Sequence, residues 1–227
     1  MNKVLICIYS SHDDLSLADD LKAYILKNCT LCDFRIITVL SNNSIKEDYF
    51  FCRHSSKLFL NVKECYTYLS RKTKLMISSC LDLFDFDYLV KWDASTMDSS
   101  RLYSKERELY SFCMEQLNSR KHLKHYSSHI RSECDSISSK KWVLRYKKGI
   151  IDILQQDGRN LKPEYLLTEK IFYMRGKNYN LSRAFCEFIK NESICREIFE
   201  KSFRHNYGCE DIAVGLCFEE FQKKSQS

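Results

Sequence analysis

The sequence has no apolar run near the roughly 18 residues that a membrane-spanning helix needs, and it has one proline, Pro163. Its first residues, MNKVLICIYSSHDD, lack the features of a signal peptide, because their apolar run has the length of a strand and leads into acidic residues. We find no internal repeat and no low-complexity linker. We therefore expect one globular domain over residues 1–227, located in the cytoplasm and without a membrane span.

Cysteine is abundant, with 12 residues, but their distribution does not favour a disulfide framework. They are scattered through helix-like and strand-like segments of a chain without an export signal, so we expect reduced thiols. Cys29 and Cys32 form a C-x-x-C pair that follows a predicted helix. A redox pair instead uses a helix N-terminus to lower the thiol pKa, so neither a redox nor a zinc role is expected here.

Hydrophobic periodicity predicts alternating strands and helices up to about residue 98. The continuous apolar run over residues 3–9 is typical of a strand buried on both faces, and the three- and four-residue spacing over 13–28 is typical of an amphipathic helix. The same reasoning predicts further strands over 33–41, 57–62 and 87–93, with a helix over 64–84. Strands and helices that alternate in this way form βαβ units, so an α/β fold with a mostly parallel central sheet is expected.

The second half of the chain has a mixed pattern. It predicts helices over 105–117, 181–203 and 210–224, and strands over 140–146 and 169–176. Ser182 or Asn180 is expected to cap the helix over 181–203.

The segment DYLVKWDAST, residues 87–96, presents a carboxylate at the end of a predicted strand. Ligands of open α/β sheets bind beyond the carboxyl ends of the strands, where Asp93 is expected to lie. An acid in this position can bind a divalent cation that neutralises a diphosphate leaving group. The alternative is that Asp93 only caps the turn that follows.

Four ordered motifs extend this interpretation. They are LSRKT at residues 69–73, KWDAS at 91–95, IFYMRGKNYNLSR at 171–183 and CEDIAVGLC at 209–217, with KKWVLRY at 140–146 in between. Together they resemble the β1,3-galactosyltransferase and fringe-like enzymes, glycosyltransferase family 31, over residues 60–218. The resemblance implies a single GT-A domain, Rossmann-like, with a nucleotide-sugar-binding half over 1–98 and an acceptor-binding half over 99–227.

The resemblance also implies roles at the nucleotide-sugar donor. Lys91, Asp93 and Ser95 are expected to bind the donor, and Asp93 to hold a divalent cation, manganese in this family. Lys72 would direct a positive charge at the phosphates, whereas without the family it is an ordinary solvated helix lysine. The family's triple aspartate is replaced here by Asp93-Ala94-Ser95, so its last acid is absent, and Asp98 is the next acid along the chain.

Further roles concern the acceptor. By resemblance Asp211 is the base that activates the acceptor hydroxyl, with Glu210 as its neighbour or substitute. These two acids are equally explained by a helix N-terminus, where the macrodipole favours negative charge. Gly176 would allow the chain to pass close to a sugar, or be an ordinary turn glycine. Tyr179 and Trp142 would stack on a base or sugar, or be core aromatics.

A basic, histidine-containing segment supports a different class of function. His122, His125 and His129 share a helical face, but the flanking Lys, Arg and Ser residues favour a solvated basic face over a zinc site. With the net charge of +6, the segment also permits nucleic-acid binding. In that reading Tyr126 stacks on a base, and the phosphates are contacted by Lys121, Lys124, Arg131, Lys140 and Lys141. No helix-turn-helix, zinc-finger or single-stranded RNA motif accompanies these residues.

The sequence thus predicts an inverting glycosyltransferase that moves a hexose or related sugar from a nucleotide-sugar, a UDP-sugar, to a hydroxyl of a glycan or glycoprotein. An inactive relative that still binds nucleotide or glycan is the first alternative, and a nucleic-acid-binding module is the second.

Overall fold

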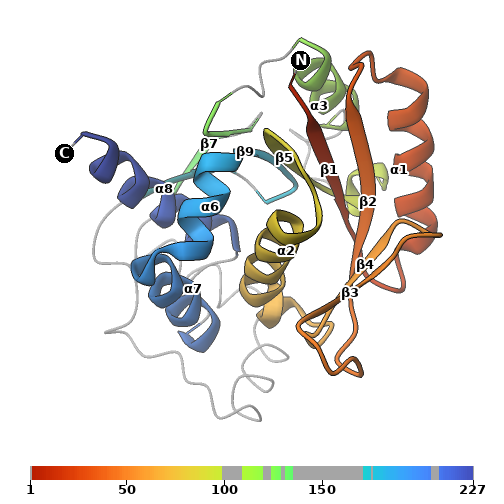
Figure 1. Ribbon diagram of the computed structural model, residues 1–227. Helices are drawn as coiled ribbons and strands as arrows, with labels where there is room; N and C mark the ends of the chain where they lie inside the picture. Colours follow the sequence, from red (N-terminus) through yellow and green to blue (C-terminus); the bar gives the residue numbers. More distant parts are fainter. Residues whose placement is uncertain are drawn as a thin grey trace.

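The computed structural model describes residues 2–98, 109–119, 124–128, 131–134, 171–174, 176–205 and 210–226. Within these ranges, six α-helices pack around a seven-stranded sheet, and β7 (Arg131–Cys134) and β8 (Ile171–Met174) form a separate pair (Figure 1). The strands of the large sheet, in spatial order, are β3 (Tyr49–Cys52), β4 (Lys57–Leu60), β2 (Phe34–Ser41), β1 (Val4–Tyr9), β5 (Tyr88–Asp93), β9 (Asn178–Ser182) and β6 (Tyr126–Ser127). The helices are α1 (Leu15–Asn28), α2 (Leu69–Leu83), α3 (Leu109–Asn118), α6 (Arg183–Asn191), α7 (Ser193–His205) and α8 (Glu210–Gln226).

The centre of the sheet confirms the α/β prediction for the first half of the chain. β1 pairs in parallel with both β2 and β5, and β2 pairs in parallel with β4. α1 connects β1 to β2, and α2 precedes β5, as a βαβ arrangement requires. The carboxyl ends of these strands therefore lie at one edge of the sheet.

The mostly parallel sheet that the sequence predicts is not confirmed, because the sheet is mixed. β3 runs antiparallel to β4, since the two strands are joined by a short hairpin in which Ser56 adopts a left-handed φ of 53°. On the other side, β9 is antiparallel to β5 and to β6. Both outer parts of the sheet thus differ from the predicted pattern, while its centre follows it.

The strands of the sheet centre are buried on both faces, as the continuous apolar run of β1 predicts. Leu5, Cys7 and Tyr9 join one core cluster with α2, α6 and α8. Ile6 and Ile8 join a second cluster on the opposite face, with α1 and α3. Figure 1 shows this division, with α1 on one side of the sheet and α2 and α6 on the other. Successive side chains of β5 therefore face different environments.

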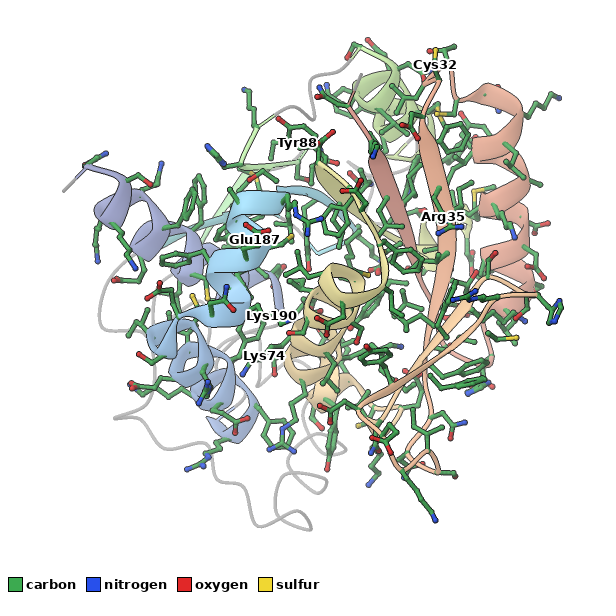
Figure 2. The ribbon with its side chains drawn as sticks, in the orientation of Figure 1. Cys32, Arg35, Lys74, Tyr88, Glu187 and Lys190 are labelled. Atoms are coloured by element: carbon green, nitrogen blue, oxygen red, sulfur yellow. The ribbon has the colours of Figure 1, made fainter. Side chains whose placement is uncertain are left out.

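The helix predicted over residues 181–203 is two helices preceded by a strand. β9 takes Leu181 and Ser182, after which the Ser182 hydroxyl caps α6 by accepting a hydrogen bond from the Phe185 amide at 3.2 Å. Glu192 is extended and separates α6 from α7. α6 lies beside α2, and Lys190 on α6 forms an ion pair with Asp82 on α2 (Figure 2).

Several predictions lie outside the described residues. These include the strand over 140–146 with Trp142, and residues 105–108 of the helix predicted over 105–117. The described remainder of that helix is α3. Of the three histidines, only His125 is described; its Nδ1 lies 2.8 Å from the Ser182 hydroxyl, and its ring is 5.0 Å from that of Phe221.

Candidate active site

Asp93 is the last residue of β5, at the edge where the parallel strands end. It is in register with Tyr9 at the end of β1, and the 3₁₀ turn Ala94–Met97 follows it. The carboxylate of Asp93 makes no capping hydrogen bond to this turn; instead the Thr96 hydroxyl donates to the Asp93 carbonyl at 2.8 Å. The Asp93 side chain therefore does not cap the turn, and 23% of its surface is exposed.

Lys91 is the centre of the candidate site, and it lies two residues before Asp93 on the same face of β5. Its ammonium is 2.8 Å from Asp93 Oδ1 and 3.0 Å from Glu210 Oε1, and it also donates to the Gly176 carbonyl. The side chain is only 1% exposed. Burial alone would lower the pKa of Lys91, but the charges of Asp93 and Glu210 raise it above its ordinary value. The lysine is therefore positively charged and shared between two acids.

The two acids at the start of α8 lie inside the protein. The Asp211 carboxylate accepts a hydrogen bond from the Gly176 amide at 3.1 Å and one from the Ile212 amide at 2.9 Å. Burial, together with the negative charge of Glu210, raises the pKa of Asp211 to about 7. A helix N-terminus favours acids in general. A carboxyl group that titrates near neutrality is in addition suited to accept a proton.

Gly176 is required by close packing against these acids. A Cβ atom built on this residue would lie 2.7 Å from Glu210 Oε1 and 3.5 Å from Asp211 Oδ2. Both main-chain groups of Gly176 are used, since its amide contacts Asp211 and its carbonyl accepts from Lys91. The absence of a side chain therefore leaves room for the Glu210 carboxylate, while the main chain contacts Asp211 and Lys91.

Two tyrosines enclose the Lys91 ammonium. It lies 4.5 Å from the ring centroid of Tyr9 and 5.4 Å from that of Tyr179, so both rings stabilise its charge. Tyr179 is fully buried in the core cluster. The structure therefore places Tyr179 as a core aromatic beside the site. Tyr9, which the sequence did not single out, also donates or accepts a hydrogen bond with the Thr73 hydroxyl at 3.2 Å.

Lys72 lies in α2 at the same edge of the sheet and is almost completely buried. Its ammonium donates to the Ser10 carbonyl at 2.7 Å and forms an ion pair with Glu64 at 3.2 Å. It is also 4.6 Å from the Tyr9 ring centroid. Burial lowers the pKa of Lys72, and the charge of Glu64 opposes this shift. Lys72 thus lies at this edge of the sheet with its charge offset by Glu64.

Ser95 contacts Lys177, a residue that sequence reasoning missed. The Lys177 ammonium donates to the Ser95 hydroxyl at 2.8 Å, and the Lys177 carbonyl accepts from the Asp93 amide at the same distance. Residue 177 is thereby held to the end of β5 through both its side chain and its main chain. The signal available in the sequence was a basic residue beside Gly176 in a chain that lacks the acid expected at position 95.

The residues around Asp93 do not fit a divalent cation of the kind the resemblance implies. Magnesium and manganese are held mainly by carboxylate and other oxygen ligands. Here the Asp93 carboxylate is paired with one ammonium, and the Ser95 hydroxyl with another. Among the residues that the structure describes, no three His, Cys, Asp or Glu side chains come together as a metal site.

The residues of the nucleic-acid alternative are not gathered in the described structure. Lys124 is exposed, whereas Tyr126 is buried in the core, where its hydroxyl accepts a hydrogen bond from the Met174 amide at 2.9 Å. Tyr126 is thus not available to stack on a base. Lys121, Lys140 and Lys141 lie outside the described residues.

Cys29 and Cys32 are both free thiols, and every cysteine for which the structure describes a side chain is likewise unpaired. None of the helices in the described ranges has both the length and the apolar character needed to span a membrane.

A scan of this chain against models of protein families gives no match, and a search of curated proteins gives none either.

Proposed function

We propose that the chain is an inverting glycosyltransferase of GT-A type, which transfers a hexose or related sugar from a UDP-sugar to a hydroxyl of a glycan or glycoprotein. One observation carries the proposal. The ammonium of Lys91 contacts Asp93, Gly176 and Glu210, which belong to three of the sequence motifs behind the resemblance. These motifs are far apart in the sequence, and the fold brings them together at the carboxyl edge of the sheet, where ligands of open α/β sheets bind.

The proposed reaction assigns Asp211 as the base. Its carboxylate takes the proton of the acceptor hydroxyl while that oxygen forms a bond to the anomeric carbon of the donor sugar. The bond between this carbon and the diphosphate oxygen breaks, and UDP leaves with the electron pair. Attack from the face opposite the leaving group inverts the anomeric configuration. The pKa of about 7 for Asp211 supports this role, because the group is then partly ionised at neutral pH.

The remaining roles follow from position at the edge of the sheet. Asp93 keeps part of its carboxylate exposed there, and we propose that it binds the donor. Lys91 and Gly176 hold the acids in place and do not contact the donor themselves. We propose that residues 1–98 supply most of the donor site, and that residues 99–227 bind the acceptor and complete the active site.

Binding without turnover is the second candidate. Both oxygens of the Asp211 carboxylate already accept main-chain hydrogen bonds, from Gly176 and Ile212, as a purely structural acid would. In this case the protein binds a sugar nucleotide or a glycan but does not transfer the sugar.

A comparison of binding with turnover tests the proposal. UDP release is measured with a panel of UDP-sugars, with and without added manganese, for the wild type, Asp211→Asn and the control Asp20→Asn. Asp20 is an exposed acid on α1, on the other face of the sheet. We expect turnover in the wild type and the control and its loss in Asp211→Asn. Nucleotide binding without turnover in the wild type favours the second candidate, and the absence of both rejects the sugar-nucleotide interpretation.

A further inference from the structure

We propose that Lys177 supplies the positive charge for the donor diphosphate, so that UDP binds without a divalent cation. This inference rests on the proposed function, because it concerns the same donor site. At position 95 the family pattern has an acid, whereas this chain has Ser95. The structure places the Lys177 ammonium 2.8 Å from that serine hydroxyl.

The position of Lys177 is fixed by the strands on which it borders. β9 runs antiparallel to β5 with Asn178 opposite Trp92, so Lys177 stands next to the end of β5. The hydrogen bond from the Asp93 amide to the Lys177 carbonyl, at 2.8 Å, holds its main chain there. The ammonium is thus held at the edge where the donor is proposed to bind.

The charge of Lys177 remains available to an anion. A hydroxyl accepts one hydrogen bond from the ammonium but cannot neutralise it, and two further N–H groups remain. The side chain is partly exposed; its charge acts on the nearby Asp93 carboxylate, but within the described part of the chain no carboxylate lies close enough to form an ion pair with it. This sets Lys177 apart from Lys91, which is paired with the buried Glu210, and from Lys72, which is paired with the exposed Glu64.

A divalent cation in the same place would meet two ammonium groups. The Lys91 ammonium is shared by Asp93 and Glu210, and the Lys177 ammonium donates a hydrogen bond to the Ser95 hydroxyl. Both ammonium groups would repel a cation bound beside them, and a single carboxylate already paired with lysine is a poor ligand set for manganese. A fixed ammonium meets the same electrostatic need as the metal, since either one offsets the negative charge of a diphosphate.

Lys177 could alternatively serve only as a structural bridge between β9 and the turn after β5. The two roles differ in what they require of Ser95. A bridge needs the hydroxyl, whereas a phosphate-binding ammonium needs only its own charge. Ser95→Ala removes the bridge and keeps the charge, while Lys177→Gln removes the charge.

Calorimetric titration with UDP and with uridine tests this inference, in buffer that contains either EDTA or manganese. In EDTA we expect wild-type protein to bind UDP with an affinity within about threefold of that in manganese. Lys177→Gln is expected to weaken UDP binding by about tenfold or more and to leave uridine binding unchanged. Lys177→Arg and Ser95→Ala are expected to retain UDP binding. Lys27→Gln removes an exposed lysine at the far end of α1, and no change is expected.

Each other result has a distinct meaning. If UDP binds only in manganese, this inference is overturned and the proposed function stands. Equal losses of UDP and uridine affinity in Lys177→Gln, or a loss in Ser95→Ala as large as that in Lys177→Gln, would show a structural bridge and overturn it too. If no condition gives UDP binding, the proposed function itself fails. Melting of each unliganded variant shows whether it is folded.

Discussion

Lys91 and Glu210 are 119 positions apart in the sequence, and their side chains meet at 3.0 Å inside the protein. Burial of an ion pair carries a desolvation penalty, and removal of one partner leaves the other charge buried and unpaired. Here the same ammonium also holds Asp93 and the main chain of Gly176.

Lys91→Met should destabilise the protein strongly. The substitution keeps most of the side-chain volume but leaves two acids without their shared cation, and breaking a buried pair in this way costs about 3–5 kcal/mol. Chemical denaturation measures the free energy of unfolding. The matched control is Lys190→Met, which breaks the more exposed pair with Asp82 and should lower this free energy by less than about 1 kcal/mol. If both variants lose the same free energy of unfolding, the buried pairs of Lys91 stabilise the protein no more than an exposed pair does, which would contradict this prediction.

Gly176→Ala should destabilise the protein through Glu210. The new methyl group would lie 2.7 Å from Glu210 Oε1 and push that carboxylate away from Lys91, so a loss of about 1–3 kcal/mol is expected in denaturation. A double-mutant cycle with Glu210→Ala identifies the cause. Once the carboxylate is absent, the added methyl group should cost much less than in the wild-type background. Additive losses would show that the strain has another source.

The activity should depend on the ionisation of Asp211. A base must be deprotonated to accept a proton, so kcat/KM should rise with pH and level off above the pKa of about 7. A profile recorded from about pH 5 to about pH 9 tests this expectation. Asp20→Asn should keep the same profile. A rate that is flat through neutrality would remove Asp211 from the role of base.

The same carboxyl group should give stability a characteristic pH dependence. The pKa of Asp211 is about 7 in the folded protein, compared with about 3.9 for an unfolded aspartate, so between these values the folded state binds the extra proton. The contribution of Asp211 to the free energy of unfolding therefore falls as pH rises from about 4 to about 7. Asp211→Asn should remove this slope. Urea denaturation of both proteins over this range measures the difference, and parallel curves would contradict the raised pKa.

Nucleic-acid binding can be separated from nucleotide binding by salt dependence. We expect UDP to raise the melting temperature, because a ligand that binds only the folded state stabilises it. Retention on heparin should fall only weakly with salt, because a steep fall requires many lysine and arginine contacts to the polyanion, as on a nucleic-acid-binding surface. Steep salt dependence together with no shift from UDP would favour the nucleic-acid alternative.

The centre of the fold could be predicted because its strands are buried on both faces. β1 and β5 appear in the sequence as continuous apolar runs, and the spacing of apolar residues in α1 and α2 is equally clear. β9 was missed because Asn178 and Asn180 give it a polar composition and its end merges with the pattern of α6. β3 was also missed, although it is no shorter than β4, which was predicted.

The acids of the site could be proposed from motifs, but their contacts could not. Asp93, Glu210 and Gly176 were singled out by resemblance, and the structure brings them together around Lys91. Lys177 could not be placed beside Ser95, because this contact exists only when β9 adds to the sheet antiparallel to β5. Pairing between strands that are distant in sequence leaves no local periodic signal.

The contact between Lys91 and Glu210 also determines when the site can form during folding. β5 can join β1 early, since these strands belong to the same half of the chain, but Lys91 then has no partner from α8. Closing the long loop between Lys91 and Glu210 is slow compared with forming local helices and turns. The Lys91 cluster is therefore completed only when α8 docks, and a folding intermediate that lacks this helix would have an assembled central sheet but neither Glu210 nor Asp211 in place.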